Sequence, residues 1–227
     1  MLSIIIPCLN EADGIVDALN ALAPMRARGV EVVVVDCGSS DRTCALAQPL
    51  ADQIIQAPRG RALQMNAGAA HAHGDLLLFL HADCRLPAQA DGLVTDGLNR
   101  AQKTWGRFDV ELQGSNPLFR VVGALMNLRS RLTGISTGDQ GLFVTRTLFE
   151  AAGKFPVIAL MEDVAFTKQL KRYGRPLNLR HRMRVSGRRW EKHGVLRTVF
   201  LMWRLRWLYW LGTNPDKLAQ YYALHKP

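Results

Sequence analysis

The first eighty residues alternate short apolar runs with segments of helical periodicity. The apolar runs at 2–6, 30–35 and 76–80 predict strands, and 53–56 predicts a shorter one. Between them, 11–22, 41–50 and 61–73 have helical spacing, with Ser39 or Ser40 near the N-cap of the second segment. This alternation predicts a mainly parallel, Rossmann-like sheet that is doubly wound, with right-handed crossovers and flanking helices.

The second half has a less regular pattern. It predicts strands at 108–112 and 141–145 and two short strands within 176–185. Helices are expected at 117–132, where Asn116 would cap the first turn and Pro117 would begin it, at 162–173, and at 195–212, which is rich in aromatic residues. No linker, repeat or low-complexity stretch interrupts the pattern. The sequence therefore predicts one α/β domain over residues 1–227 with a C-terminal aromatic helix.

Composition excludes a disordered or collagen-like chain, because 48% of the 227 residues are hydrophobic and only 21% are charged. The net charge of +10 indicates an anionic partner, which could be nucleic acid, an acidic membrane or a phosphorylated small molecule. The four cysteines form no CxxC pair, and we see neither a signal peptide nor an apolar run long enough to span a membrane. We therefore expect free thiols and a cytoplasmic location.

Unusual polar residues follow three of the predicted strands. Asn10 and Glu11 follow the first strand, Asp36 ends the second, and Asp83 follows the strand at 76–80. In an open α/β sheet these carboxyl ends meet at one edge, where ligands bind. Asp36 and its neighbour Asp41 could instead serve only as turn and cap residues. The chain has neither a P-loop nor a GxGxxG segment, so a phosphate would have to be held in another way.

Four segments, in this order, resemble family 2 glycosyltransferases with the GT-A fold. Residues 3–11 resemble the opening strand of that family, and 33–43 resemble its VDDGSxDxT segment. Residues 61–83 resemble the GxxxAxNxGxxxAxGDxxxxLDAD stretch, and 161–163 resemble the catalytic ED pair. The resemblance implies a GT-A domain with a nucleotide-sugar half at 1–114 and an acceptor half at 115–227.

The resemblance also implies roles for single residues. Asp36 would accept a hydrogen bond from the uracil of a UDP-sugar, and Asp83 would hold a divalent cation, Mg²⁺ or Mn²⁺, on the diphosphate. His81 stands where an aspartate is usual, which makes the metal site less secure, and His193 could supply a further ligand or be a surface histidine. The other residues expected at the nucleotide-sugar are Pro7, Asn10, Glu11, Arg61 and Ala82.

The remaining predicted site residues lie in the second half. Asp163, beside Glu162, would act as general base in an inverting displacement, although an acidic pair also suits the start of a helix. Arg188, Arg189 and Trp190 resemble an RW motif that grips the diphosphate, within a basic segment that could also be a solvated face. Residues 136–141, 161–163 and 186–190 together resemble a small cytosolic branch of the family that includes the selenosugar synthase of selenoneine biosynthesis.

That narrower resemblance implies transfer from UDP-N-acetylglucosamine or UDP-glucose to selenophosphate, with a new C–Se bond and release of UDP. Asp139 and Gln140 would lie near the acceptor, or would simply form a polar turn. A lipid phosphate or another small acceptor is the alternative, and a basic nucleic-acid-binding module is the alternative without catalysis. The aromatic helix at 195–212 could pack on the sheet, form a homodimer or lie on a membrane surface.

Overall fold

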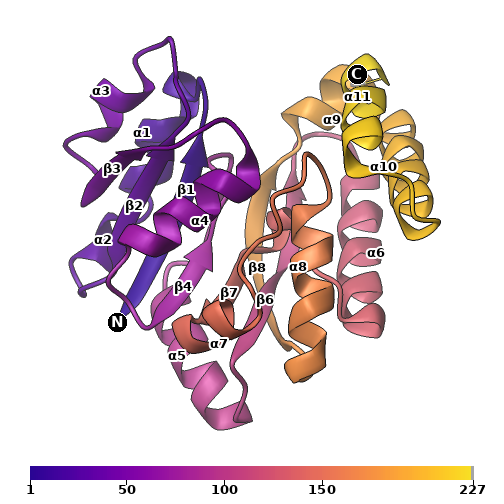
Figure 1. The fold of residues 1–227 in the computed structure, drawn as a ribbon. Coiled ribbons are helices and arrows are strands. Elements are labelled where there is room, and N and C mark those ends of the chain that lie inside the picture. The colour runs from indigo at the N-terminus through magenta and orange to yellow at the C-terminus, as the bar shows by residue number, and fades with distance from the viewer. Residues whose placement is uncertain (226–227) are drawn as a thin grey trace.

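One mixed sheet organises the chain in the computed structural model, which describes residues 1–225 except for the side chains of Arg189, Lys192 and His193. Its eight strands have the spatial order β3-β2-β1-β4-β7-β6-β8-β5 (Figure 1). Their bounds are β1 Leu2–Cys8, β2 Glu31–Asp36, β3 Gln53–Gln56, β4 Leu76–Phe79, β5 Cys84–Arg85, β6 Trp105–Gln113, β7 Leu142–Thr145 and β8 Leu177–Ser186.

Helices cover both faces of this sheet. The α-helices are α1 Ala12–Asn20, α2 Ala23–Arg26, α3 Thr43–Ala47, α4 Arg61–His71, α5 Ala90–Ala101, α6 Leu118–Thr133, α7 Arg146–Ala151, α8 Glu162–Leu170, α9 Arg188–His193, α10 Val195–Trp210 and α11 Pro215–His225. Short 3₁₀ turns, η1 and η2, occupy Gly138–Gln140 and Lys171–Tyr173.

The first half confirms the α/β prediction. Strands β3, β2, β1 and β4 are all parallel neighbours, with Ile5 opposite Val33 and Phe79. Ile4 and Ile6 point into a core formed with α1, α3 and α5, whereas Ile5 points into a second core formed with α4, α7 and α8. A strand that is buried on both faces needs apolar residues at consecutive positions, which explains the uninterrupted runs in the sequence.

The second half makes the sheet mixed, although four of its seven strand pairs are parallel. Strand β7 is antiparallel to both β4 and β6, and β5 is antiparallel to β8, while β6 and β8 are parallel. The two strands predicted within 176–185 are one strand, and its register against β6 shifts between Phe108 and Asp109. Such a β-bulge leaves extra residues on one strand and breaks the side-chain alternation that sequence analysis relies on.

Several helix boundaries differ from those predicted. The helix expected at 41–50 is only Thr43–Ala47, and Asp41, not Ser39 or Ser40, accepts a hydrogen bond from its first backbone N–H, that of Thr43. Helix α6 begins at Leu118, with Pro117 in the N-cap position, but Asn116 caps the first turn as predicted, because its side-chain oxygen accepts from the Leu118 N–H at 3.0 Å. The chain also forms α2, α5, α7, α9 and α11, which the apolar pattern did not reveal. Of these, α2 and α7 have only four and six residues, which gives too few periodic positions for a helix to stand out.

A buried polar cluster fixes α6 against the sheet. Arg107 on β6 is fully buried and pairs with Asp109, which also pairs with Arg131 of α6. Asn127 on α6 donates to the carbonyl oxygen of Val110 at 3.0 Å and accepts from its N–H at 2.9 Å. Because each buried charge has a partner, the cluster favours one orientation of α6 over others.

Among residues 1–225, no helix combines the length and the hydropathy that a segment crossing a bilayer requires.

Candidate active site

Hydrogen bonds within the loop after β2 hold Asp36. Its carboxylate accepts from the N–H groups of Gly38 and Ser39 and from the Ser39 hydroxyl, and the residue is 1% exposed. Burial alone would raise the pKa of Asp36, but these hydrogen bonds lower it overall. Asp36 therefore shapes the loop, and the uracil contact expected of it stays a prediction.

The loops after β1 and β2 are tied to each other. The Asn10 side chain accepts from the Ser40 N–H at 2.9 Å, and the Asn10 N–H donates to the Ser39 hydroxyl at 2.9 Å. Asp41 accepts from the Ala12 N–H at 3.1 Å. Asn10 has φ 54°, a left-handed conformation that asparagine tolerates better than most residues. These contacts give the strand-end edge a preformed polar rim.

Beside this rim lies a cavity of about 400 Å³, which we call the nucleotide cavity. It collects residues from the loop after β1, from β5 and from the end of β8. Its lining residues are Asn10, Glu11, Asp13, Gly14, Ala82, Asp83, Arg85, Gln113, Arg184, Ser186 and Arg188. Five of the residues predicted to bind the nucleotide-sugar are among them. Pro7, in β1, and Asp36 do not line it.

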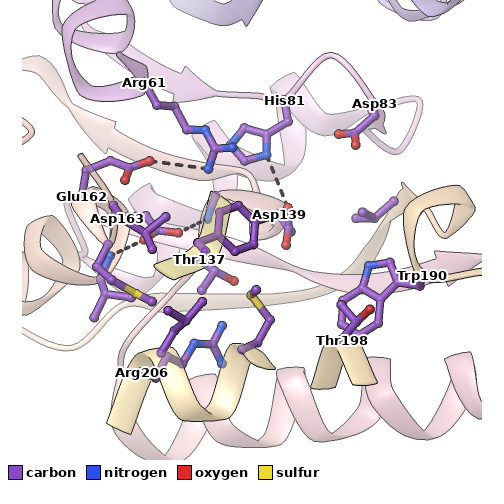
Figure 2. Close-up of a pocket in the computed structure, with 18 of the residues that line it drawn as sticks. Arg61, His81, Asp83, Thr137, Asp139, Glu162, Asp163, Trp190, Thr198 and Arg206 are labelled. Atoms are coloured by element: carbon purple, nitrogen blue, oxygen red, sulfur yellow. Dashed lines mark hydrogen bonds and ion pairs between the residues drawn. The ribbon is translucent and has the colours of Figure 1, made fainter. Parts of the chain in front are cut away.

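A second cavity, of about 200 Å³, adjoins the first, and we call it the central cavity (Figure 2). Arg61, His81 and Asp83 lie on one side of it, with Arg206 and Trp190 opposite. The Arg61 guanidinium lies 3.6 Å from the Glu162 carboxylate, and His81 Nδ1 lies 3.3 Å from Asp139 Oδ1. Residues from 61 to 222 thus meet around one small volume.

Glu162 and Asp163 begin α8 and differ in their surroundings. Asp163 accepts from the Gly138 N–H at 2.8 Å and from the Val164 N–H at 2.7 Å, so both of its oxygens are oriented. Glu162 is 3% exposed, and burial, with the nearby charge of Asp163, raises its pKa although Arg61 opposes this. Asp163 is therefore the better oriented carboxylate, and Glu162 is the one that burial disfavours as an anion.

Candidate metal donors occur where the resemblance places the cation. One donor atom each from His81, Asp83 and Cys84 lies within 4.8 Å of the others. Burial, with the nearby Asp83 and Asp139, holds the pKa of the Cys84 thiol well above its usual range, which disfavours the thiolate form that binds metals. His81 Nδ1 faces Asp139, so Asp83 is the donor best suited to a hard divalent cation.

A third cavity, of about 520 Å³, lies between α6 and α10, and we call it the apolar cavity. Leu125, Leu128 and Leu132 line it from α6, and Val199 and Trp203 line it from α10. Two arginines, one from each helix, face the same space.

Those two arginines are Arg129 and Arg206. Arg129 has two buried nitrogens, Nε and Nη2, without a hydrogen-bond partner among the described residues. Burial, and next the charge of Arg206, lowers the pKa of Arg129 to about 10. Burial also lowers the pKa of Arg206, although Asp163 and Asp139 oppose it. Two half-buried cations, one of which has buried N–H groups without a partner among the described residues, suit an anionic ligand.

The structure places the other predicted acceptor and phosphate residues unevenly. Asp139 and Trp190 each line both the central and the apolar cavity. Gln140 is fully buried, its side chain accepts from the Thr137 N–H, and it lines none of the three cavities. The side chains of Arg189 and His193 lie outside the described residues. Gln140 thus supports the turn that presents Asp139.

Sequence analysis did not single out Arg129 and Arg206. They lie within the helices predicted at 117–132 and 195–212, and neither was among the expected site residues. The available signal was an arginine on an otherwise apolar helix face, since such a residue is rarely buried without a partner.

The three cavities form one row. The nucleotide and central cavities share Asp83 and Ser186, and the central and apolar cavities share Asp139, Trp190, Met202 and Arg206. The polar nucleotide cavity is thereby joined to the central cavity, which contains carboxylates. The central cavity is joined in turn to the apolar cavity, which two arginines line.

Residues 3–147 match glycosyl transferase family 2. The chain belongs to this family. The match ends before Glu162 and Asp163, so the catalytic roles expected of these two residues stay predictions.

The most similar curated relatives include three glycosyltransferases. Undecaprenyl-phosphate 4-deoxy-4-formamido-L-arabinose transferase of Edwardsiella ictaluri is 23% identical over 89% of this chain and 66% of the relative, and that of Pseudomonas aeruginosa is 26% identical over 90% and 64%. Glycosyltransferase AglE of Haloferax volcanii is 28% identical over 79% and 64%. This chain thus spans about two thirds of the length of these relatives.

Solved structures share the fold. Staphylococcus aureus TarS 1-349 in complex with UDP-GlcNAc has a TM-score of 0.65 at 19% identity, over 82% of this chain and 58% of that one. Mannosyltransferase PcManGT from Pyrobaculum calidifontis, with GDP-Man and Mn²⁺, has a TM-score of 0.64 at 23% identity, over 90% and 60%. These likenesses confirm the predicted GT-A fold.

Proposed function

We propose that this protein transfers a glycosyl group, with inversion, from a UDP-sugar to a lipid phosphate. The continuous row of three cavities carries the proposal, because each has the chemistry that one part of this reaction requires. The UDP would occupy the nucleotide cavity, the transferred sugar the central cavity, and the acceptor the apolar cavity, with its phosphate between Arg129 and Arg206.

The donor assignment rests on the polar rim and on related structures. The rim formed by Asn10, Ser39 and Ser40 is fixed before any ligand binds, so little ordering free energy is lost on binding. Asp83 would hold Mg²⁺ or Mn²⁺ beside the diphosphate, where the cation would offset the charge of the departing UDP. PcManGT holds Mn²⁺ with a GDP-sugar, and TarS holds a UDP-sugar.

In the chemical step, an acceptor phosphate oxygen would attack the anomeric carbon while the bond from that carbon to the UDP oxygen breaks. UDP leaves with the bonding electron pair. Asp163, held by the Gly138 and Val164 N–H groups, would take the remaining acceptor proton when the phosphate is a monoanion. Displacement by a single direct attack inverts the configuration at that carbon.

Two anions, selenophosphate and a lipid phosphate, are candidates for the acceptor. Selenophosphate, which the narrower family resemblance implies, would fit between Arg129 and Arg206 but would leave the apolar cavity without a partner. A lipid phosphate would use both the cations and the leucines of α6. The names of the relatives from Edwardsiella and Pseudomonas include undecaprenyl-phosphate. We therefore favour the lipid phosphate over selenophosphate.

The decisive experiment is product mass spectrometry with UDP-N-acetylglucosamine or UDP-glucose, Mg²⁺ or Mn²⁺, and either farnesyl phosphate or selenophosphate. Release of UDP with a glycosylated farnesyl phosphate supports the proposal. A selenium-containing sugar would instead establish the acceptor implied by the narrower resemblance. Binding of RNA or DNA that falls with salt, without UDP binding, would favour the nucleic-acid module.

A further inference from the structure

The outer face of α6 exposes a row of large apolar side chains. Their exposed fractions range from 39% to 68%, and they recur at helical spacing along the side turned away from the sheet: Leu118, Val121, Leu125, Leu128 and Leu132. The opposite side of this helix carries Phe119 and Asn127, which are buried against β6 and its neighbours. A helix needs only that inner side to pack on the sheet, so packing does not explain the outer row.

The outer face of α10 is also apolar and is mainly aromatic. Its exposed residues are Leu196, Phe200, Trp203, Trp207 and Trp210, with exposed fractions from 57% to 74%. Phe200 contacts Trp203 edge to face, with ring centroids 6.2 Å apart, and Trp207 lies 5.3 Å from Trp210. The helix buries other residues, Leu201 and Leu205, in a core with α11. Four large aromatic rings thus remain on its surface.

The two outer faces form one surface. Leu125, Leu128 and Leu132 of α6 and Trp203 of α10 are exposed, and the same four residues line the apolar cavity between the helices. The two helices lie side by side in Figure 1, α10 in yellow and α6 in pink. We call this surface the α6–α10 face. It surrounds the mouth of the apolar cavity and is larger than the scattered apolar residues that ordinary protein surfaces carry.

Charge selects the partner of this face. Neither α6 nor α10 contains an aspartate or a glutamate, and Arg120, Arg197 and Arg204 are exposed along them. The chain as a whole has a net charge of +10. An anionic surface with an apolar interior complements this combination of tryptophans, leucines and arginines. A second copy of the chain would bring arginines against arginines and would cover the mouth of the cavity.

We infer that the α6–α10 face docks on the surface of an anionic phospholipid bilayer. The two helices lie in the plane of the interface, with tryptophan rings at the headgroup level and arginines on the phosphates. The inference stands independently of the proposed function, since binding to vesicles can be measured without turnover. If both hold, a lipid phosphate enters the apolar cavity directly from the bilayer.

Vesicle flotation tests the inference with the whole chain. The probes are vesicles of pure phosphatidylcholine and vesicles of phosphatidylcholine with phosphatidylglycerol at about three to one. We expect binding to the anionic vesicles that is at least tenfold tighter than to the neutral ones and that weakens as salt rises. Tryptophan fluorescence should shift to shorter wavelength on binding, because the exposed indoles leave water.

A triple variant, Phe200→Ser, Trp207→Ser and Trp210→Ser, removes exposed rings that do not line the apolar cavity. It should lower vesicle affinity at least tenfold while keeping the melting temperature and UDP binding of the native chain. Val157→Ser is the matched control, since Val157 is 65% exposed but lies outside both helices. This control should bind vesicles as the native chain does.

Three outcomes would overturn the inference. One is equal vesicle binding by the native chain and the folded triple variant. Another is a dimer in light scattering that the triple variant converts to a monomer, together with no vesicle binding by either, because the face would then belong to a second copy. A folded native chain that ignores vesicles but still releases UDP on turnover would reject docking and leave the proposed function intact.

Discussion

The two ends of the row of cavities are built in opposite ways. At the nucleotide end, the polar groups of Asn10, Asp36 and Asp41 already have hydrogen-bond partners within the chain. At the acceptor end, Arg129 has buried nitrogens without partners among the described residues, and leucines and tryptophans remain exposed. A site whose polar groups are already paired has a fixed shape and can bind a defined small ligand with little rearrangement. The acceptor end instead has unpaired cationic groups and exposed apolar groups, which a ligand or a surface would have to contact.

The largest expected effect lies between the two ends. Asp163→Asn keeps the size of the side chain and removes its charge, so turnover should fall by roughly a hundredfold or more. Dissociation constants for UDP should stay within about twofold, because Asp163 does not line the nucleotide cavity. Steady-state kinetics and calorimetry measure these quantities. A variant that retains turnover would remove Asp163 from the chemical step.

Substitution of Asp83 tests the nucleotide end of the row. Asp83→Asn should lower turnover at least tenfold, about 1.4 kcal/mol, and should weaken the dependence of UDP binding on Mg²⁺ or Mn²⁺. Its matched control is Asp75→Asn, since Asp75 is an exposed carboxylate whose partner is the chain N-terminus. UDP affinity that depends equally on metal in native chain and Asp83→Asn would show that another group holds the cation.

Substitution of Arg129 tests the acceptor end of the row. Arg129→Leu should raise KM for farnesyl phosphate roughly tenfold, since a charged hydrogen bond contributes about 1.5–3 kcal/mol, while UDP affinity stays unchanged. Arg172→Leu, at an exposed arginine on η2, is the control and should leave KM as it is. If Arg129→Leu weakens UDP and farnesyl phosphate equally, the two ends do not act separately.

The smallest expected effect concerns Glu162 and pH. Burial raises the pKa of Glu162 in the folded state, so its contribution to stability is present below the unfolded pKa and is lost as pH rises through the folded pKa. Glu162→Gln should therefore raise Tm at about pH 7 by a few degrees and flatten the fall of Tm between mildly acidic and neutral pH. Thermal unfolding from about pH 4 to 8 measures this. A Tm that falls at every pH would mean that the Arg61 contact outweighs burial.

The fold was predictable where each strand is buried on both faces, because such strands need continuous apolar residues, as 30–35 shows. Strand β8 was less predictable from the sequence, because residues such as Arg182 and Met183 alternate between exposed and buried and a bulge interrupts this alternation. The antiparallel placement of β7 between β4 and β6 depends on contacts between distant segments, which no local pattern reveals.

The site divides in the same way. Asn10, Glu11 and Asp83 stand beside their strands in the sequence, so the parallel order alone predicted that they converge, and the nucleotide cavity contains all three. Arg129 and Arg206 are 77 positions apart on two helices, and only the packing of α10 beside α6 gives them one cavity.

By itself, the sequence determined the α/β class, the strand-end carboxylates and the family, because these depend on local runs and ordered motifs. Only the tertiary structure decided which polar groups form hydrogen bonds within their own loop, as those of Asp36 do. It also decided which buried polar groups have no partner among the described residues, as on Arg129. The physical reason is that hydrogen bonding and burial are properties of atoms brought together from distant parts of the chain, and the identity of a residue does not state what it will meet.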